Sequence, residues 1–335
     1  MGKIVRFQNR VAESFLTLPV CVTLVVLTWC FPLWGNDSDS FVMKLGTWEF
    51  ELSQVWAEHL LGLSVCLCIA YVIAETNNSL QIIRIRTRLM SCVWMVLFVC
   101  LPFVHPIGPP VLCAFCYVVA LFLLYRCYQE ETPVIQVFHC MFCIGVGSLF
   151  WIPLIGTGIL FFFGFWTILR YYSWRCFWGG LIGLILPYWC WFLWALGTNN
   201  YLPLINHLRQ LSDLQIPSFS LFLQWPTYWW ICWILSASLA VIGIIHFYLT
   251  SFNDRLRVRT IFHLYFAQSL FFQIALFLQP NFYPVLMPLF LIVTTPFVAH
   301  FFALTHSRVS NLLFCLACMS CFALLVMQLF DFAYW

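Results

Sequence analysis

Long uncharged stretches dominate the sequence, and they predict where its helices lie. Four of them contain no Asp, Glu, Lys or Arg, namely 15–36, 89–125, 132–169 and 260–307. A helix needs about 20 apolar residues to cross the hydrocarbon core of a membrane. The first stretch is therefore long enough for one membrane span, and each of the other three is long enough for two.

The three double stretches each contain a proline or glycine cluster near the middle, which is typical of a turn between two helices. Four shorter apolar stretches predict one further span each. The sequence thus predicts an all-α bundle of about eleven transmembrane helices, a single integral membrane domain over residues 1–335. The turn clusters lie at 105–110, 152–156 and 279–284, and the single spans at about 57–74, 177–197, 227–250 and 309–330.

The basic residues predict the orientation of this bundle, because Lys and Arg gather in cytoplasmic loops. With a cytoplasmic N-terminus and eleven spans, thirteen of the 15 basic residues fall on the cytoplasmic side, and only Lys44 and Arg209 fall outside. Most of the 17 tryptophans lie near the outer boundary, which suits their preference for membrane–water interfaces. We therefore expect the N-terminus inside and the C-terminus outside, with residues 1–35 retained as a first span rather than cleaved as a signal peptide.

Composition excludes several classes of protein. The chain is 63% hydrophobic and 8% charged, with a mean hydropathy of +0.94, whereas a soluble domain has about 25% charged residues. A soluble enzyme, a disordered chain and a nucleic-acid binder are therefore excluded. The net charge of +3 follows from the orientation signal and requires no acidic partner.

The 17 cysteines lie almost entirely inside the predicted spans, which argues against a disulfide framework. Three pairs have the CxxC spacing, and residues three apart share a helix face, so each pair offers two thiols to a metal. A zinc site requires four converging ligands, whereas thiols inside a membrane also serve as small packing groups. We expect packing and no metal site from these pairs, which are Cys113/Cys116, Cys140/Cys143 and Cys315/Cys318.

Two predicted outer segments are longer than the other loops. Residues 35–55 are acidic, and the alternation within them would place Glu49 and Glu51 on one face of an extended strand. Residues 198–226 contain leucines at helical spacing, and Pro203 suits a helix start. This second segment is typical of an amphipathic helix that lies in the plane of the outer membrane surface.

Two basic clusters of the form Arg-x-Arg-x-Arg stand on the predicted cytoplasmic side, each just before a span. They are consistent with a weak parallel repeat, or with the positive-inside rule alone. Such clusters also bind anionic lipid headgroups, at about 1 kcal/mol per residue, or dock a cytoplasmic protein. The two clusters are Arg84, Arg86, Arg88 and Arg255, Arg257, Arg259.

Three segments in the middle of the chain share a pattern of small, aromatic and proline residues. They are 138–153, 169–175 and 183–188, with Asn78 before them. Over about residues 75–195 this pattern resembles an uncharacterised multi-pass inner-membrane family of Bacteroidota. The resemblance implies a bacterial inner-membrane protein and carries no agreed activity. The family often has an acid at the position of His139 and Glu at that of Cys176, and this chain departs from it at both.

No Asp, Glu, Lys or Arg lies at the middle of a predicted span. Ion-coupled transporters keep such a group near the bilayer midplane to bind the ion or proton, so the sequence disfavours ion-coupled transport. The polar side chains inside the spans more often form helix–helix hydrogen bonds than proton relays. We expect those near cytoplasmic helix ends, His246 and His263, to be wet or to cap the helix ends. They are His139, His246, His263, His300, Gln268 and Gln273.

The outer acids are the candidate catalytic residues. Their place after the first span is similar to that in membrane glycosyltransferases that use polyprenyl-phosphate sugars. There, one carboxylate deprotonates an acceptor hydroxyl and another holds Mg²⁺ or Mn²⁺ against a departing phosphate, while a basic residue contacts that phosphate. Acids are also ordinary in outer loops, because basic residues are excluded there. The acids are Asp37, Asp39, Glu49 and Glu51, and the basic residue is Arg209.

Three functions remain open at this point. The first is envelope biogenesis, in which the protein handles a lipid-linked glycan on the outer face, with a divalent metal as the one cofactor that such a transfer implies. The second is flippase-like transport without ion coupling. The third is a non-catalytic scaffold that recruits a membrane or cytoplasmic protein. In all three the lipid bilayer is a partner and nucleic acid is not.

Overall fold

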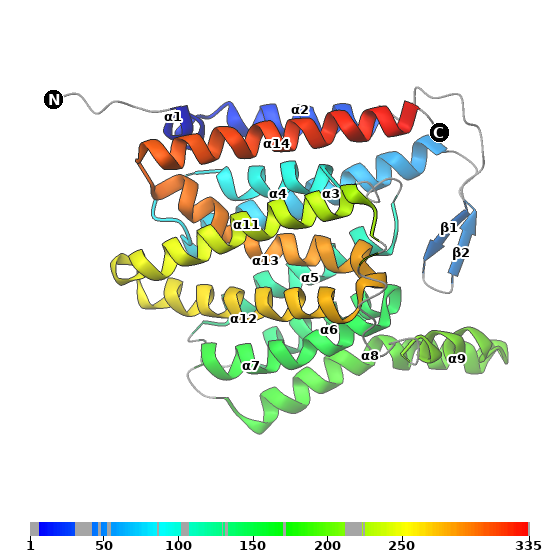
Figure 1. Ribbon diagram of the computed structural model, residues 1–335. Helices are drawn as coiled ribbons and strands as arrows, with labels where there is room; N and C mark the ends of the chain where they lie inside the picture. Colours follow the sequence, from blue (N-terminus) through cyan, green and yellow to red (C-terminus); the bar gives the residue numbers. More distant parts are fainter. Residues whose placement is uncertain are drawn as a thin grey trace.

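The computed structural model describes residues 7–30, 42–45, 48–51, 55–85, 87–101, 107–128, 130, 133–169, 172–211, 223 and 225–333; of residues 42–45, 48–51, 55 and 329–333 it describes the backbone alone. These residues form an all-α helical bundle with one small β-hairpin beside it (Figure 1). The first half of the chain contains α1 (Phe7–Glu13), α2 (Thr17–Cys30), β1 (Val42–Leu45), β2 (Trp48–Glu51), α3 (Val55–Leu80), α4 (Leu89–Val99), α5 (Pro109–Arg126) and α6 (Val134–Phe150). The second half contains the 3-10 helix η2 (Ile152–Thr157), α7 (Gly158–Ile168), α8 (Trp174–Thr198), α9 (Leu202–Arg209), α11 (Thr227–Thr250), η3 (Ser251–Asn253), α12 (Leu256–Leu278), η4 (Pro280–Phe282), α13 (Tyr283–Leu304) and α14 (Arg308–Ala333).

Helix α13 is the centre of the bundle. Almost all of its side chains are buried, Pro288 and Pro296 among them, because it packs against α4, α5, α11 and α12. A helix that is apolar on all sides suits such a position. A Cβ added at Gly243 of α11 would lie 2.7 Å from the Phe297 backbone of α13. The close approach of these two helices therefore depends on glycine at this position.

Among the described residues, seven helices are long and apolar enough to cross a membrane, or eight if α1 and α2, which meet at 87°, form one span. The chain is therefore a multi-pass membrane protein. Each of the eleven predicted spans corresponds to a helix of the bundle, but α4, α6 and the η2–α7 pair are shorter than predicted. The 11 residues of α4 make about 16 Å of helix, against a hydrocarbon core of about 30 Å.

Two of the predicted turns are confirmed as short 3-10 helices. Helix η2 begins at Ile152 with Pro153 in its first turn, and η4 covers Pro280–Phe282. Proline fits these starts because the first residues of a helix need no N–H donor. Of the third cluster, at 105–110, the structure describes Ile107 onward, and α5 begins there at Pro109.

The helices alternate in direction, so the described arginines gather at one end of the bundle apart from Arg209; we call this the basic end. In Figure 1 it includes α1 and the turns α11–α12 and α13–α14, whereas β1, β2 and α9 lie at the opposite end. The positive-inside rule predicts that this end faces the cytoplasm. The arginines at this end are Arg10, Arg84, Arg88, Arg126, Arg175, Arg255, Arg257, Arg259 and Arg308.

The described residues of the two long outer segments contain a β-hairpin and a short helix. The alternating residues after Gly46 form β2, which pairs antiparallel with β1 so that Glu49 is opposite Lys44. Helix α9 begins at Leu202 with Pro203 in its first turn, as expected, but it ends at Arg209. Residues 212–222 and 224 lie outside the described part of the chain, and the in-plane position of α9 stays a prediction.

Glycines of the family-like pattern bring α6 and α8 together. A Cβ added at Gly145 would lie 2.6 Å from the Leu184 carbonyl oxygen, and one at Gly183 would overlap the Phe138 carbonyl oxygen. The two helices therefore pack with their backbones in near contact, as small residues allow in membranes. In this chain, these positions of the pattern serve helix packing.

Candidate functional site

The two arginine clusters, far apart in the sequence, meet at the basic end. Arg84, between α3 and α4, donates from Nε to Asp254 Oδ1 at 2.5 Å. Arg255, just before α12, donates from Nη1 to Gln81 Oε1 at 3.2 Å. Gln81 itself has a φ of 51°, a left-handed conformation that is uncommon outside glycine. The contacts join segments that are 170 and 174 positions apart in the sequence.

Asp254 is the buried acid of this junction. Its side chain is 1% exposed, and its Oδ2 lies 3.5 Å from Nε2 of the fully buried His300. The His300 ring lies 5.5 Å from that of His246. Burial by itself would raise the pKa of Asp254, but the neighbouring His300 and Arg84 outweigh it and hold this pKa below its ordinary value. The carboxylate is therefore ionised at neutral pH, and Arg84 compensates its charge.

Side-chain hydrogen bonds hold the segment between α3 and α4 in place. Asn77 donates from Nδ2 to the Thr87 carbonyl and accepts from the Ile83 N–H, both at 3.1 Å. Thr87 in turn donates from Oγ1 to the Ala12 carbonyl of α1 at 2.7 Å. The segment that carries the first arginine cluster is thus hydrogen-bonded both to α3, through Asn77, and to α1, through Ala12.

Two arginines of the second cluster, Arg257 and Arg259, contact groups in or near the turn between α11 and α12. Arg259 donates from Nε to the Asp254 carbonyl at 2.9 Å and from Nη2 to the Phe252 carbonyl at 3.2 Å. The Arg257 guanidinium carbon lies 5.3 Å from the centroid of the Tyr128 ring. These two arginines therefore stabilise the turn between α11 and α12 and the nearby end of α5.

A polar cleft of about 920 Å³ opens between the two arginine segments and the turn from α1 to α2; we call it the basic cleft. Arg88 and Arg255 are exposed there, and the Arg88 guanidinium carbon lies 5.2 Å from the Phe15 ring centroid. Glu13 is the exposed acid of the lining, and Asp254 is the buried one. Arg86 of the first cluster lies outside the described residues.

The basic cleft suits an anion better than a cation. Guanidinium groups bind phosphate and carboxylate oxygens through paired N–H donors, and the amides of Asn78 and Gln81 add neutral hydrogen-bonding groups to the lining. The cleft lies at the basic end, where the helices end. Within the described part of the chain, no three His, Cys, Asp or Glu side chains converge as metal ligands. The arrangement can therefore bind and orient an anion at the basic end of the bundle.

The outer candidate residues stay predictions. Asp37 and Asp39 lie outside the described residues. Glu49 and Glu51 lie on β2, of which the backbone alone is described. Arg209 ends α9 and is exposed. The structure therefore neither brings the four acids and the arginine together nor separates them.

The histidines inside the spans divide into exposed and buried ones. His139 and His263 are exposed. His246 is half-buried, with its ring 5.5 Å from that of His300 and 5.2 Å from that of Phe301. Helix α11, which carries His246, packs closely on α13. The buried histidines thus belong to the surroundings of Asp254.

The cysteine thiols take part in helix packing. All 17 cysteines are free. Cys113 of α5 donates to the Gly147 carbonyl of α6 at 3.5 Å, and Cys140 of α6 donates to the Ala120 carbonyl of α5 at 3.1 Å. Two of the CxxC pairs therefore provide small hydrogen-bonding groups at the contact between α5 and α6, as expected for thiols in a membrane.

Sequence reasoning missed Asp254 and His207. Asp254 directly precedes the second arginine cluster, and an acid among cytoplasmic arginines is the signal that identifies it. His207 is the buried residue of α9, with Nε2 at 3.1 Å from the Ser148 carbonyl oxygen, while Leu208 and Leu211 are exposed. Burial lowers the pKa of His207. The leucine spacing drew attention to the face of α9 that points away from the protein.

No family model, curated protein or solved structure matches this chain. The resemblance to the Bacteroidota family therefore stays a prediction from the sequence. The functional conclusion depends on the geometry of the basic end.

Proposed function

We propose that this chain is a multi-pass protein of a bacterial inner membrane that binds the phosphate headgroup of a membrane lipid in the basic cleft. The observation that carries the proposal is the junction of the two arginine clusters. There Arg84 is hydrogen-bonded to Asp254, and the side chains of Arg88 and Arg255 are exposed beside this pair. A phosphate placed between exposed arginines accepts paired hydrogen bonds from them. Each such arginine adds about 1 kcal/mol to the binding of an anionic lipid.

The arginine segments are fixed in place by side-chain hydrogen bonds, which supports a ligand site in addition to an orientation signal. The positive-inside rule requires arginines near helix ends and gives them no particular partners. Here Asn77 and Thr87 fix the first segment, and the Arg84–Asp254 pair fixes the two segments to each other. The exposed positive groups therefore share one cleft instead of spreading over the membrane surface.

The envelope function expected from the sequence is compatible with this cleft. A lipid-linked glycan carries a phosphate and an apolar chain in one molecule, and the cleft offers a cytoplasmic site for such a lipid. Sugar transfer on the outer face is the separate part of the proposal that depends on Asp37, Asp39, Glu49 and Glu51, with Arg209 on the phosphate and a divalent metal as cofactor. Changing all four acids to amides is expected to abolish transfer and to leave lipid binding at the basic cleft unchanged.

Lipid binding by the purified protein tests the cytoplasmic part. Phosphatidylglycerol and phosphatidylcholine share a diacylglycerol body, and only the first carries a net negative charge. We expect wild-type protein to bind phosphatidylglycerol more tightly. We expect Arg88→Gln to weaken this binding about fivefold, which corresponds to about 1 kcal/mol.

Arg126→Gln is the matched control for this measurement. Arg126 also lies at the basic end over an aromatic ring, 5.5 Å from the Phe122 centroid, but it does not line the cleft. Its loss is expected to change phosphatidylglycerol affinity by less than about twofold. Equal affinity of Arg88→Gln and wild-type protein for phosphatidylglycerol would overturn the proposal.

A further inference from the structure

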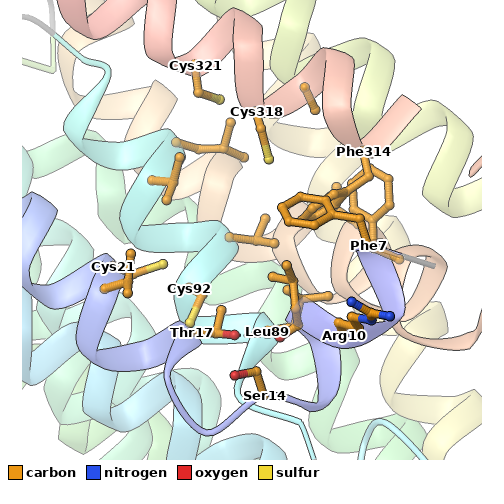
Figure 2. Close-up of a pocket in the computed structure, with 18 of the residues that line it drawn as sticks. Phe7, Arg10, Ser14, Thr17, Cys21, Leu89, Cys92, Phe314, Cys318 and Cys321 are labelled. Carbon is orange, nitrogen blue, oxygen red and sulfur yellow. Dashed lines mark hydrogen bonds between the residues drawn. The ribbon is translucent and has the colours of Figure 1, made fainter. Parts of the chain in front are cut away.

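An apolar groove of about 530 Å³ lies beside the basic cleft, within the range of about 300–1,000 Å³ typical of ligand sites. Helices α2 and α14 form its sides, α4 forms its floor, and α1 closes it at the basic end (Figure 2). Its lining is mostly aliphatic carbon, aromatic carbon and sulfur, as at Leu97, Phe314 and Cys92. Figure 2 shows Cys318 pointing from α14 into this space.

The apolar groove and the basic cleft are continuous around the turn from α1 to α2. Ser14, in this turn, lines both of them. On the facing side Arg88 lines the cleft, and the next residue, Leu89, lines the groove. An apolar surface therefore meets a basic one where α2 and α4 emerge at the basic end. A membrane lipid has the same division, with a hydrocarbon chain next to a polar headgroup.

The turn between the two sites is held from both sides. Because α1 and α2 meet at 87°, α1 lies along the membrane surface when α2 crosses the membrane. Gln8 of α1 donates from Nε2 to the Phe302 carbonyl of α13 at 2.6 Å, and Thr87 donates to the Ala12 carbonyl. Arg10, exposed on α1, lines the groove at its basic end. The turn is thus a preformed corner with an arginine on each side.

We infer that the apolar groove holds the hydrocarbon chain of the lipid whose phosphate occupies the basic cleft, and that this lipid enters sideways between α2 and α14. The inference rests on the proposed function and names its ligand class, a phosphate-bearing membrane lipid as opposed to a soluble phosphate. Charge complementarity supports this occupant, because Arg10 and Arg88 flank the corner where its phosphate would lie. An apolar helix of a second copy would match the groove and leave these arginines without a counter-charge.

Filling the groove tests the inference without changing an arginine. Cys318→Phe puts a larger side chain into the space, whereas Met319→Phe changes the next residue, which is 68% exposed and does not line the groove. We expect Cys318→Phe to weaken binding of dioleoyl phosphatidylglycerol by about tenfold or more, because losing the burial of two methylene groups already has that effect. Met319→Phe is expected to stay within about twofold of wild type. Equal affinities of the two variants would overturn the inference.

Photolabelling of wild-type protein gives a second measurement that does not depend on a variant's folding. Phosphatidylglycerol with a diazirine near the end of its chain is expected to label groove residues of α2, α4 and α14, and Arg88→Gln is expected to reduce this labelling. Labelling confined to other lipid-facing helices, such as α8, would contradict the inference.

Competition by a soluble headgroup separates failure of the inference from failure of the proposed function. If glycerol 3-phosphate binds as tightly as dioleoyl phosphatidylglycerol and Arg88→Gln weakens both, the cleft binds phosphate and the groove holds no chain. If Arg88→Gln weakens neither, the proposed function itself is wrong. The expected result is weak binding of glycerol 3-phosphate and tight binding of the long-chain lipid, both reduced by Arg88→Gln.

Discussion

The two arginine clusters share one sequence pattern and differ in what their side chains do. In the first, Arg84 donates to the buried Asp254 of a segment that is distant in the sequence, and Arg88 is exposed at the basic cleft. In the second, Arg259 binds carbonyl groups of its own turn and Arg257 lies over an aromatic ring. The first cluster therefore connects distant segments. In the second, Arg257 and Arg259 stabilise a local turn, and Arg255 alone makes a distant contact, with Gln81.

This difference shows that the number of arginines at a helix end says little about ligand binding. An arginine whose N–H groups already have protein partners stabilises the fold. An arginine that is exposed beside such a pair is available to a ligand, and Arg88 is the clearest case among the described residues. The division predicts separate effects on stability and on lipid binding.

The largest loss of stability is expected for Asp254→Asn. The change keeps the shape of the side chain and removes the charge that Arg84 and His300 face. Because hydrogen bonds to charged groups contribute about 1.5–3 kcal/mol, we expect the free energy of unfolding in detergent to fall by about 2 kcal/mol. Glu130→Gln removes an exposed acid near the same end and is expected to cost less than about 0.5 kcal/mol. Similar losses in both variants would contradict the role given to Asp254.

Acidification is expected to remove the stabilisation that the ionised Asp254 side chain provides. The pKa of Asp254 is lower in the folded protein than in the unfolded chain, where a carboxyl of this type has a pKa of about 3.9. The ionised carboxylate therefore stabilises the fold above about pH 4, and this stabilisation is lost as the pH falls through the folded-state pKa. Unfolding of wild-type protein and Asp254→Asn, followed from pH 7 to pH 3, should give a difference that shrinks at the acidic end. A difference that grows there would contradict this assignment.

Arg84→Gln and Arg88→Gln are expected to separate stability from lipid binding. Arg84 is paired with Asp254 but its side chain is 40% exposed, so water screens the pair, and we expect a loss of about 1 kcal/mol in stability. Arg88→Gln is expected to change stability by less than about 0.5 kcal/mol, since its main contact is an exposed ring. Thermal unfolding without added lipid measures both variants. A larger loss for Arg88→Gln than for Arg84→Gln would reverse the comparison.

The smallest effect is expected for Arg257→Gln. Its contact with the Tyr128 ring is a single cation–π interaction at the membrane surface, which contributes about 0.5 kcal/mol. Phosphatidylglycerol affinity should stay at the wild-type value, because Arg257 does not line the basic cleft. A fivefold loss of that affinity would show that Arg257, in addition to Arg255, binds the lipid, and would contradict this prediction.

The all-α membrane bundle and the difference between its two ends could be predicted from the sequence, because a charged side chain inside hydrocarbon costs several kcal/mol. This constraint acts on each residue separately and leaves a stretch without charged residues at each predicted span. The length of α4 could not be predicted in this way, since the apolar residues that follow it resemble helix residues. The bend between α1 and α2 was missed because Ser14, Phe15 and Leu16 include no proline or glycine.

The junction at Asp254 was beyond prediction for a different reason. Arg84 and Asp254 are 170 positions apart, and no local pattern specifies which arginine an acid will contact. The continuity of the basic cleft with the apolar groove depends on the same tertiary packing, since the α1–α2 turn must dock beside Thr87. In contrast, the alternation around Glu49, which would place Glu49 and Glu51 on one face of an extended segment, is a local property, and β2 is extended there.

The affinity of an Arg88→Gln/Arg255→Gln double variant for phosphatidylglycerol tests the central claim most directly. Two changes of about 1 kcal/mol each predict a loss of about 30-fold, with the free energy of unfolding in the absence of lipid altered by less than about 1 kcal/mol. Phosphatidylcholine affinity should remain as in wild-type protein. A double variant that folds normally and binds phosphatidylglycerol with undiminished affinity would contradict the account.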